Sequence, residues 1–381
     1  SKIAVYDEFG SNLRKLIDYF CQLAVSPEFY SQLEASDKEF AKTGYLEKIK
    51  WLKDENDDLY DPGYADLLRV SFTSEFNRGK MGDLVSLLTG RNFETREFEA
   101  EIQENTFKRL EKSLLKFTNE LNFKKFIMII RSTGFMDSRL INSRATINFA
   151  YVVYLKLRDL DISQSEIESF VRKWFVMSIL TGRYSSSPES TFDADIKNIS
   201  TDYQKHLKFV EDTELSEAFW SVALVSELEK SNPTSPYLST FFASQVKEND
   251  RGFLSTNITI RDMVEERGDM HHIFPKAYIK KTFNNKRDYN QIANLVYAQS
   301  EINSSIKDTP PLEYFAVVLE QCNGGPVKYG GITDLKTLKI NMEQNCIPES
   351  IFNMSVDHYH QFLKERRTLM AKKIKSYYNN L

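Results

Sequence analysis

A helical spacing of apolar residues runs through the first two thirds of the chain and constrains its fold more than any other feature. Residues 147–160 are apolar nearly all round, which is typical of a helix buried on most sides. A second stretch has apolar residues at three- and four-residue steps and predicts one helix stripe: Phe107, Leu110, Leu114, Phe117 and Leu121. We therefore expect a mainly α-helical chain, with residues 1–245 forming a helical domain around segment 147–160.

The start and the end of one of these helices can also be predicted. Ser163 and Glu166 have the spacing of a capping box, in which the two side chains satisfy free N–H groups at a helix start. Gly182 is a plausible end, because glycine readily adopts the left-handed conformation that closes a helix. The sequence therefore predicts a helix between Ser163 and Gly182.

Length and composition fit a folded protein with more than one domain. The 381 residues exceed one simple core, and a content of 41% hydrophobic and 27% charged residues excludes a disordered chain. No apolar run approaches the ~18–20 residues of a membrane span. The three cysteines are far apart and form no C-x-x-C pair, so we expect free thiols and a cytoplasmic location.

A change in character near residue 246 predicts a second domain. The segment 247–252 is polar and breaks the helical pattern, and β-like pieces such as 257–260 follow it. We place the boundary at about 245 and expect an α+β domain over 246–381. The chain starts at Ser1 rather than at methionine, from which we expect that an N-terminal part of a longer protein is missing.

Two adjacent histidines, His271 and His272, are the first residues of a candidate catalytic site. A predicted strand ends in this pair, a loop follows, a second strand begins at Asn294, and a short helix bears Asn303. Two strands and a helix can hold a metal ion between them, with the loop pinned by a side-chain amide. Adjacent strand residues point to opposite faces, so one histidine can hold the ion while the other faces a substrate.

Such a site suits the hydrolysis of a phosphodiester bond. A divalent ion polarises the scissile phosphate and stabilises the leaving 3′ oxygen. A neutral imidazole, with an ordinary pKa of about 6.5, takes a proton from the attacking water.

The string His-His-Ile-Phe-Pro, with Asn294-Leu295 and Asn303 downstream, resembles the HNH (His-Me finger, ββα-metal) nucleases. More specifically, it resembles the C-terminal nuclease domain of GmrSD-type restriction endonucleases, and Leu180–Ser185 is similar to the helical region before that domain. The nine-residue step from Asn294 to Asn303 matches the family's usual step. The resemblance implies that His271 and Asn303 are metal ligands, that His272 is the general base and that Asn294 braces the loop.

The resemblance also implies a function: a metal-dependent DNA endonuclease that is the effector of a bacterial restriction or anti-phage defence protein. Its partner would be double-stranded, modified DNA, and its cofactor Mg²⁺ or Mn²⁺. Many family members have Asp or Glu where His271 stands, and an imidazole ligand favours Mn²⁺ or Ni²⁺. Relatives usually carry an N-terminal nucleotide-dependent domain with an Asp-Gly-Gln-Gln-Arg motif, which this sequence lacks. A single site cuts one strand, so duplex cleavage needs a homodimer or a second event.

Local charge agrees with a DNA-binding site, although the net charge is -4. Lys307 lies one helical turn beyond Asn303, where it can reach a phosphate. A second basic run, 364–375, either contacts phosphate or is a solvated helix face. The residues after the histidine pair are the main expected phosphate contacts: Lys276, Lys280, Lys281, Lys286 and Arg287.

Two other functions stay open. The chain can be a nucleic-acid-binding module whose nuclease fold has lost activity, or a helical protein-interaction scaffold that binds partners through residues 1–245. The remaining histidines, His206, His358 and His360, lack ligand spacing and are expected to be structural or exposed. His206 is expected on a helix surface.

Overall fold

The computed structural model of the chain describes Lys15 and residues 30–54, 59–230, 232–266, 268 and 270–381. These residues belong to two compact units. Unit 1 draws its residues from Ser1–Ile130, Ser143–Ser178 and Gly182–Val210. Unit 2 draws its residues from Arg131–Asn142, Ile179–Thr181 and Glu211–Leu381.

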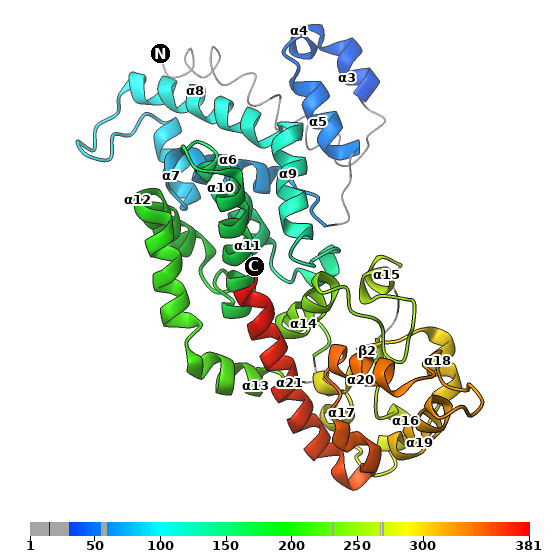
Figure 1. Ribbon diagram of the computed structural model, residues 1–381. Helices are drawn as coiled ribbons and strands as arrows, with labels where there is room; N and C mark the ends of the chain where they lie inside the picture. The colour runs from blue at the N-terminus through cyan, green and yellow to red at the C-terminus, as the bar shows by residue number, and fades with distance from the viewer. Residues whose placement is uncertain (1–14, 16–29, 55–58, 231, 267, 269) are drawn as a thin grey trace. The chain divides into compact units, whose positions relative to one another are not determined.

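Unit 1 is built from helices joined by loops (Figure 1), as the apolar spacing predicts. No helix in the described part of the chain is long and apolar enough to cross a membrane. The last residues of α9, α11 and α12 count toward unit 2. The helices are α3 (Tyr30–Ser36), α4 (Lys38–Ala41), α5 (Tyr45–Asp54), α6 (Tyr64–Phe76), α7 (Met81–Leu88), α8 (Ala100–Phe117), α9 (Glu120–Arg131), α10 (Arg144–Leu157), α11 (Gln164–Thr181) and α12 (Pro188–Glu214).

Helix α10 lies in the core of unit 1, as its apolar sequence predicts, and ten successive residues from Thr146 to Leu155 are buried. Tyr151 donates a hydrogen bond to the carbonyl oxygen of Phe117 at 2.8 Å. The predicted stripe on 107–121 is confirmed as far as Phe117, where α8 ends. The prediction that Leu121 belongs to this stripe was wrong. Leu121 lies on the next helix, α9, which begins at Glu120, and its side chain is 58% exposed.

The predicted ends of the helix between Ser163 and Gly182 are confirmed. The Ser163 hydroxyl accepts a hydrogen bond from the Glu166 N–H at 3.3 Å, and α11 begins at the residue after Ser163. Gly182 follows the last residue of α11 with a φ of +60°, which is the left-handed conformation that ends helices.

A buried polar network around Asp195 joins α12 to the end of α11. Arg183 donates to the Asp195 carboxylate at 2.7 and 2.5 Å, and the Tyr184 hydroxyl donates at 2.9 Å. Nε2 of His206 lies 3.0 Å from Oδ1 of Asp195. Burial acts to raise the pKa of Asp195, but the bonds from Arg183 and His206 hold that pKa below its usual value.

His206 is therefore a structural residue, but its predicted place on a helix surface is wrong. Its side chain is buried, and its ring lies against Trp174 with centroids 5.4 Å apart. A histidine is stable there because the Asp195 carboxylate satisfies its ring nitrogen.

Unit 2 contains the rest of the described elements. The expected boundary at about 245 does not coincide with a border between the units, because α14 packs against α15 and α21. The elements are η3 (Ser138–Leu140), the π-helical turn η4 (Phe219–Ala223), α13 (Leu224–Glu227), α14 (Pro236–Lys247), α15 (Ile260–Glu265), β1 (Met270–His272), α16 (Lys276–Ile279), α17 (Lys286–Tyr289), η5 (Ile292–Asn294), β2 (Leu295–Tyr297), α18 (Ser300–Ile306), α19 (Pro311–Cys322), α20 (Leu335–Gln344), η6 (Glu349–Asn353), η7 (Val356–His358) and α21 (Tyr359–Asn379).

Strands β1 and β2 form a two-stranded antiparallel sheet, the one named sheet within the described residues. His271 pairs with Val296 and His272 pairs with Leu295. The second strand begins one residue later than predicted, because Asn294 closes the turn η5. The β-like piece 257–260 contributes an isolated bridge between Arg251 and Thr259 and then caps α15.

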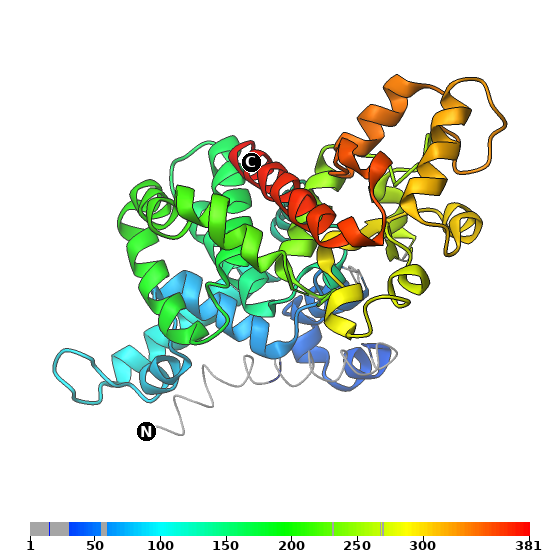
Figure 2. The same cartoon turned by 90° about the horizontal axis from the view of Figure 1, so that it is seen from below.

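The C-terminal helix α21 packs against several elements of unit 2 along one of its faces. It packs against α13, α14, η4, η5 and η7, and both ribbon views show it beside α14 (Figures 1 and 2). Its buried face carries Phe362, Leu363, Met370 and Ile374 at helical spacing, with Arg366 among them. Through η5, this helix reaches the turn that contains Asn294.

Candidate functional site

The histidine pair ends strand β1, as the sequence predicts. Both side chains are half-buried, and adjacent strand positions send them to opposite faces of the sheet. Nε2 of His272 lies 3.3 Å from the amide oxygen Oδ1 of Asn290. An oxygen acceptor favours the proton on Nε2, which leaves Nδ1 of His272 free to accept a proton.

The surroundings of His272 favour its neutral form. Burial lowers the pKa of this imidazole, and the nearby positive charge of Lys276 acts in the same direction, against the opposing bond to Asn290. A neutral imidazole is the form that acts as a base.

Asn294 braces the loop that follows the histidine pair. Its side chain is fully buried, its Oδ1 accepts from the Phe274 N–H at 2.8 Å, and its Nδ2 donates to the Phe274 carbonyl at 3.0 Å. The Ile273 N–H donates to the Asn294 main-chain carbonyl at 2.9 Å. The Tyr314 hydroxyl donates to the Ile273 carbonyl at 2.9 Å. Four hydrogen bonds therefore fix the main chain directly after His272.

Asn303 is exposed in the first turn of α18, shortly after the end of β2. Lys307 was expected on the same helix face, and this expectation is wrong. Helix α18 ends at Ile306, and Lys307 is a cap residue with φ +55° and ψ -115°. Its side chain is exposed, but helical spacing does not align it with Asn303.

In the site that the resemblance implies, His271 would supply one imidazole nitrogen and Asn303 one amide oxygen to a divalent ion. Among the residues that the structure describes, no group of three or more His, Cys, Asp or Glu side chains is arranged to hold a metal. A set of two protein donors suits an ion that takes its other ligands from water or from substrate phosphate. Both donors are neutral, so the charge of such an ion would remain available to an anionic substrate.

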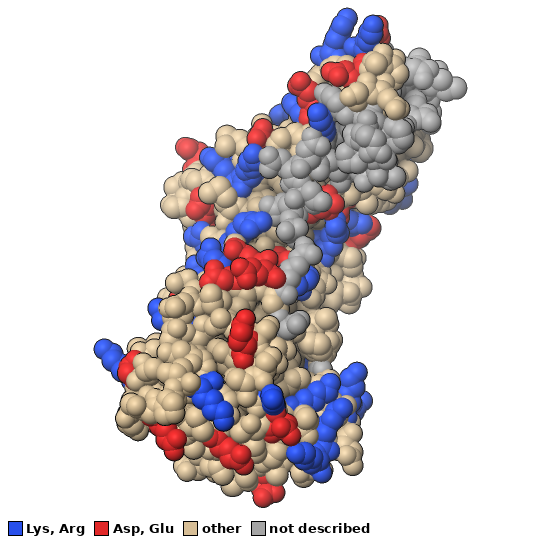
Figure 3. Space-filling view, turned by 90° about the vertical axis from the view of Figure 1, so that its right-hand side faces the viewer, with Lys and Arg blue, Asp and Glu red and all other residues tan. Residues whose placement is uncertain are grey.

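The basic residues after the histidine pair are all exposed, as a phosphate-binding role requires. Nζ of Lys276 and Nζ of Lys280 lie 5.4 and 4.8 Å from the centre of the Tyr289 ring. Lys281 pairs with Asp308 at 3.4 Å, and both side chains are exposed, so solvent screens the pair. Lys286 and Arg287 open the short helix α17. Figure 3 shows basic and acidic side chains mixed over one face of the molecule, so any phosphate-binding surface is local.

The second basic run, 364–375, is in large part neither a phosphate surface nor a solvated face. Arg366 is fully buried. Lys373 pairs with Glu248 and, at 2.8 Å, with Asp250, and Lys375 pairs with Glu217 at 2.6 Å. These pairs offset the charges of Lys373 and Lys375, which the linear run of positive charges did not indicate.

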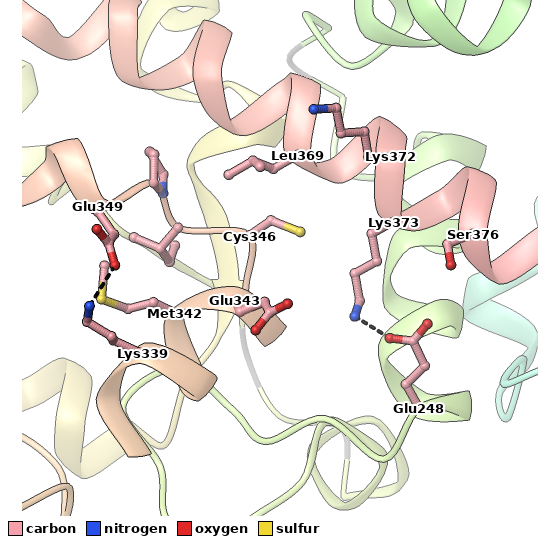
Figure 4. A pocket seen from close by; sticks show the side chains of 12 residues that line it. Glu248, Lys339, Met342, Glu343, Cys346, Glu349, Leu369, Lys372, Lys373 and Ser376 are labelled. Atoms are coloured by element: carbon pink, nitrogen blue, oxygen red, sulfur yellow. Dashed lines mark hydrogen bonds and ion pairs between the residues drawn. The ribbon is translucent and has the colours of Figure 1, made fainter. Parts of the chain in front are cut away.

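A cavity of about 790 Å³ lies beside this helix (Figure 4). It is lined by residues of α20, α21 and the loop 346–349, among them Cys346 and Lys373. None of the expected metal, base or brace residues lines it. The cavity and the candidate site are therefore separate features of unit 2.

The other two histidines are exposed, as expected. Nδ1 of His358 lies 3.1 Å from the Ser355 hydroxyl in the cap of η7. The ring of His360 meets Phe283 edge-on, with centroids 4.9 Å apart.

Two residues of this region were missed by the sequence reasoning. Asn290 orients His272, but its sequence context is an ordinary polar loop and gave no signal. Arg366 holds the η5–β2 turn through hydrogen bonds to the carbonyls of Ala293 and Leu295. Its position did carry a signal, because it shares helical spacing with the apolar residues Phe362 and Met370.

Comparisons with known proteins add one distant relative. No protein-family model matches the chain, and no solved structure matches it. The chain is 23% identical over 220 residues to the uncharacterized protein MJ0686 of Methanocaldococcus jannaschii. The aligned part is 54% of this chain and spans 36% of the relative's length. This likeness assigns neither a family nor an activity.

Proposed function

We propose that the chain is a metal-dependent endonuclease that hydrolyses phosphodiester bonds of DNA, with an HNH-type site at His271, His272, Asn294 and Asn303. One observation carries this proposal: the Asn294 amide binds both main-chain groups of Phe274, in the loop directly after the histidine pair. A brace of this kind is what the resemblance to HNH nucleases implies. Such a brace contributes to function where the neighbouring side chains, here those of the histidine pair, have to be held in one direction.

In the proposed reaction, Nδ1 of His272 takes a proton from a water molecule while the water oxygen bonds to phosphorus. The bond from phosphorus to the 3′ oxygen breaks, and that oxygen leaves with the electron pair. Asn290 holds His272 in the tautomer that this step needs. A divalent ion bound by His271 and Asn303 would supply positive charge for the leaving oxygen.

The finer parts of the proposal follow from the resemblance alone. The chain acts as the effector part of a GmrSD-type restriction protein against modified DNA, in the cytoplasm, with a nucleotide-dependent domain as partner. An imidazole ligand favours Mn²⁺ or Ni²⁺ over Mg²⁺. Cleavage of both strands requires a homodimer or two successive nicks.

Incubation with supercoiled plasmid tests the proposal. We expect conversion to the open-circular form with Mn²⁺ and with Mg²⁺, and no conversion with EDTA. Plasmids with unmodified, methylated and glucosylated bases show whether modification directs cutting. Absence of nicking with every metal and every plasmid would contradict an active nuclease and favour a DNA-binding module without activity.

A further inference from the structure

Arg366 is a fully buried arginine whose guanidinium binds main-chain carbonyl groups. Nη1 donates to the Ala293 carbonyl at 2.7 Å and to the Leu295 carbonyl at 2.9 Å. Nε and Nη2 both donate to the Asn345 carbonyl, at 3.3 and 3.1 Å. Four of the five N–H donors of the side chain are thus used.

The arginine forms no ion pair with Asp or Glu within the described part of the chain. Its hydrogen-bond partners are carbonyl oxygens, and its guanidinium carbon lies 5.9 Å from the centre of the Phe241 ring. Burial lowers the pKa of Arg366 to about 10, so the side chain is still charged at neutral pH. Removing such a charge from water is costly unless hydrogen bonds compensate. The carbonyls supply that compensation, and they can do so only if they all point at the guanidinium.

Two of these carbonyls lie on either side of Asn294. Ala293 and Leu295 are its chain neighbours. The Ala293 carbonyl belongs to the peptide directly before Asn294 and the Leu295 carbonyl to the peptide that follows Leu295, so Arg366 fixes the main chain on both sides of the brace residue. The Asn294 side chain in turn fixes the Phe274 main chain, two residues after His272. A continuous set of hydrogen bonds therefore runs from α21 to the loop beside the histidine pair.

We propose that Arg366 is a positioning residue of the candidate nuclease site, which acts through Asn294 to hold the loop that directly follows His272 in its working conformation. The inference deepens the proposed function and rests on it for the catalytic consequence. The structural step, from Arg366 to the Phe274 loop, is testable without any activity.

Arg366→Lys is the variant of choice, because lysine keeps the charge but cannot reach three separate carbonyls with a planar fork. Arg261→Lys is the matched control, since Arg261 is exposed on α15 of the same unit. Hydrogen exchange read by mass spectrometry reports the protection of segment 270–276. We expect exchange of that segment to quicken at least tenfold in Arg366→Lys and to stay within twofold of wild type in Arg261→Lys.

Plasmid nicking gives the second readout. We expect the kcat of Arg366→Lys to fall at least tenfold with KM changed less than threefold, because the DNA-contacting lysines are untouched. Should Arg366→Lys fail to fold, Arg366→Gln, which keeps amide donors for one or two carbonyls, takes its place in both measurements.

Unchanged protection of segment 270–276 would overturn the inference, and so would a uniform rise in exchange across unit 2, which indicates a purely structural residue. If the wild-type chain does not nick DNA, the proposed function fails. The exchange result then still decides whether Arg366 positions the loop.

Discussion

The two asparagines of the candidate site, Asn294 and Asn303, differ in burial and in hydrogen bonding. Asn294 is fully buried with both amide atoms bonded to Phe274, whereas Asn303 is exposed. A buried polar group that loses its partner costs about 1–3 kcal/mol. Substitution of Asn294 should therefore lower the stability of the fold, whereas substitution of Asn303 should affect activity alone.

We predict that Asn294→Ala lowers the free energy of unfolding by about 2 kcal/mol and also abolishes nicking, since the loop loses its brace. Asn303→Ala should change stability by less than about 0.5 kcal/mol but reduce nicking and Mn²⁺ binding. Urea denaturation measures the stability, titration calorimetry the Mn²⁺ binding and the plasmid assay the nicking. Equal stability losses in the two variants would contradict the assigned roles.

At the scale of secondary-structure elements, the sequence allowed the order of the candidate site to be predicted. The strand ending at His272 and the helix bearing Asn303 depend on local periodicity and turn chemistry, which a sequence displays. The role of Asn294 as the brace came from the resemblance to HNH nucleases, because its partner Phe274 lies 20 residues away in sequence. The side-chain direction of Lys307 was not predictable, because a positive φ is uncommon for a residue other than glycine and a lysine gives no sign of it. Nor were the carbonyl partners of Arg366 predictable, since they lie about 20 and 70 residues away in sequence.

The Asp195 network gives unit 1 a defined response to acid. The pKa of Asp195 is lowered, so this carboxylate stabilises the fold above its usual value of 3.8, and that stabilisation is lost as the pH falls through the lower, folded-state pKa. Asp195→Asn should cost about 3 kcal/mol or more at pH 7, because Arg183 and His206 lose a buried charged partner. The difference in the free energy of unfolding between this variant and the wild type should shrink as the pH falls below 3.8.

Urea denaturation from pH 7 to pH 3 checks this prediction. Asp161→Asn is the control, because Asp161 is exposed in the same unit and should change stability by less than about 0.5 kcal/mol. A difference for Asp195→Asn that stays constant with pH would show that its charge is not the source of the effect.

At the scale of the whole molecule, the net charge of -4 means that DNA binding has to come from a local surface. We propose the exposed basic residues of α16, α17 and their loop as this surface. Each phosphate contact contributes about 0.9 to the slope of log affinity against log salt concentration. Binding should therefore weaken steeply as salt rises.

Lys280→Gln/Lys286→Gln should reduce that slope by about 0.9 for each contact removed, with little dependence on DNA sequence. Lys112→Gln/Lys205→Gln removes the same charge from exposed positions of unit 1 and serves as the control. Fluorescence anisotropy with a labelled duplex measures both slopes. Equal slope changes in the two double variants would place DNA binding elsewhere or show that it is nonspecific.

The most direct test of the central claim is the rate of plasmid nicking by His272→Ala, with His360→Ala as the control for an exposed histidine of the same unit. General-base catalysis contributes about 10²–10⁴ in rate. The account therefore predicts a loss of that size in His272→Ala, a wild-type rate in His360→Ala, and no nicking by any variant in EDTA. Nicking by His272→Ala at the wild-type rate would contradict the assignment of His272 as the base and, with it, the proposed site.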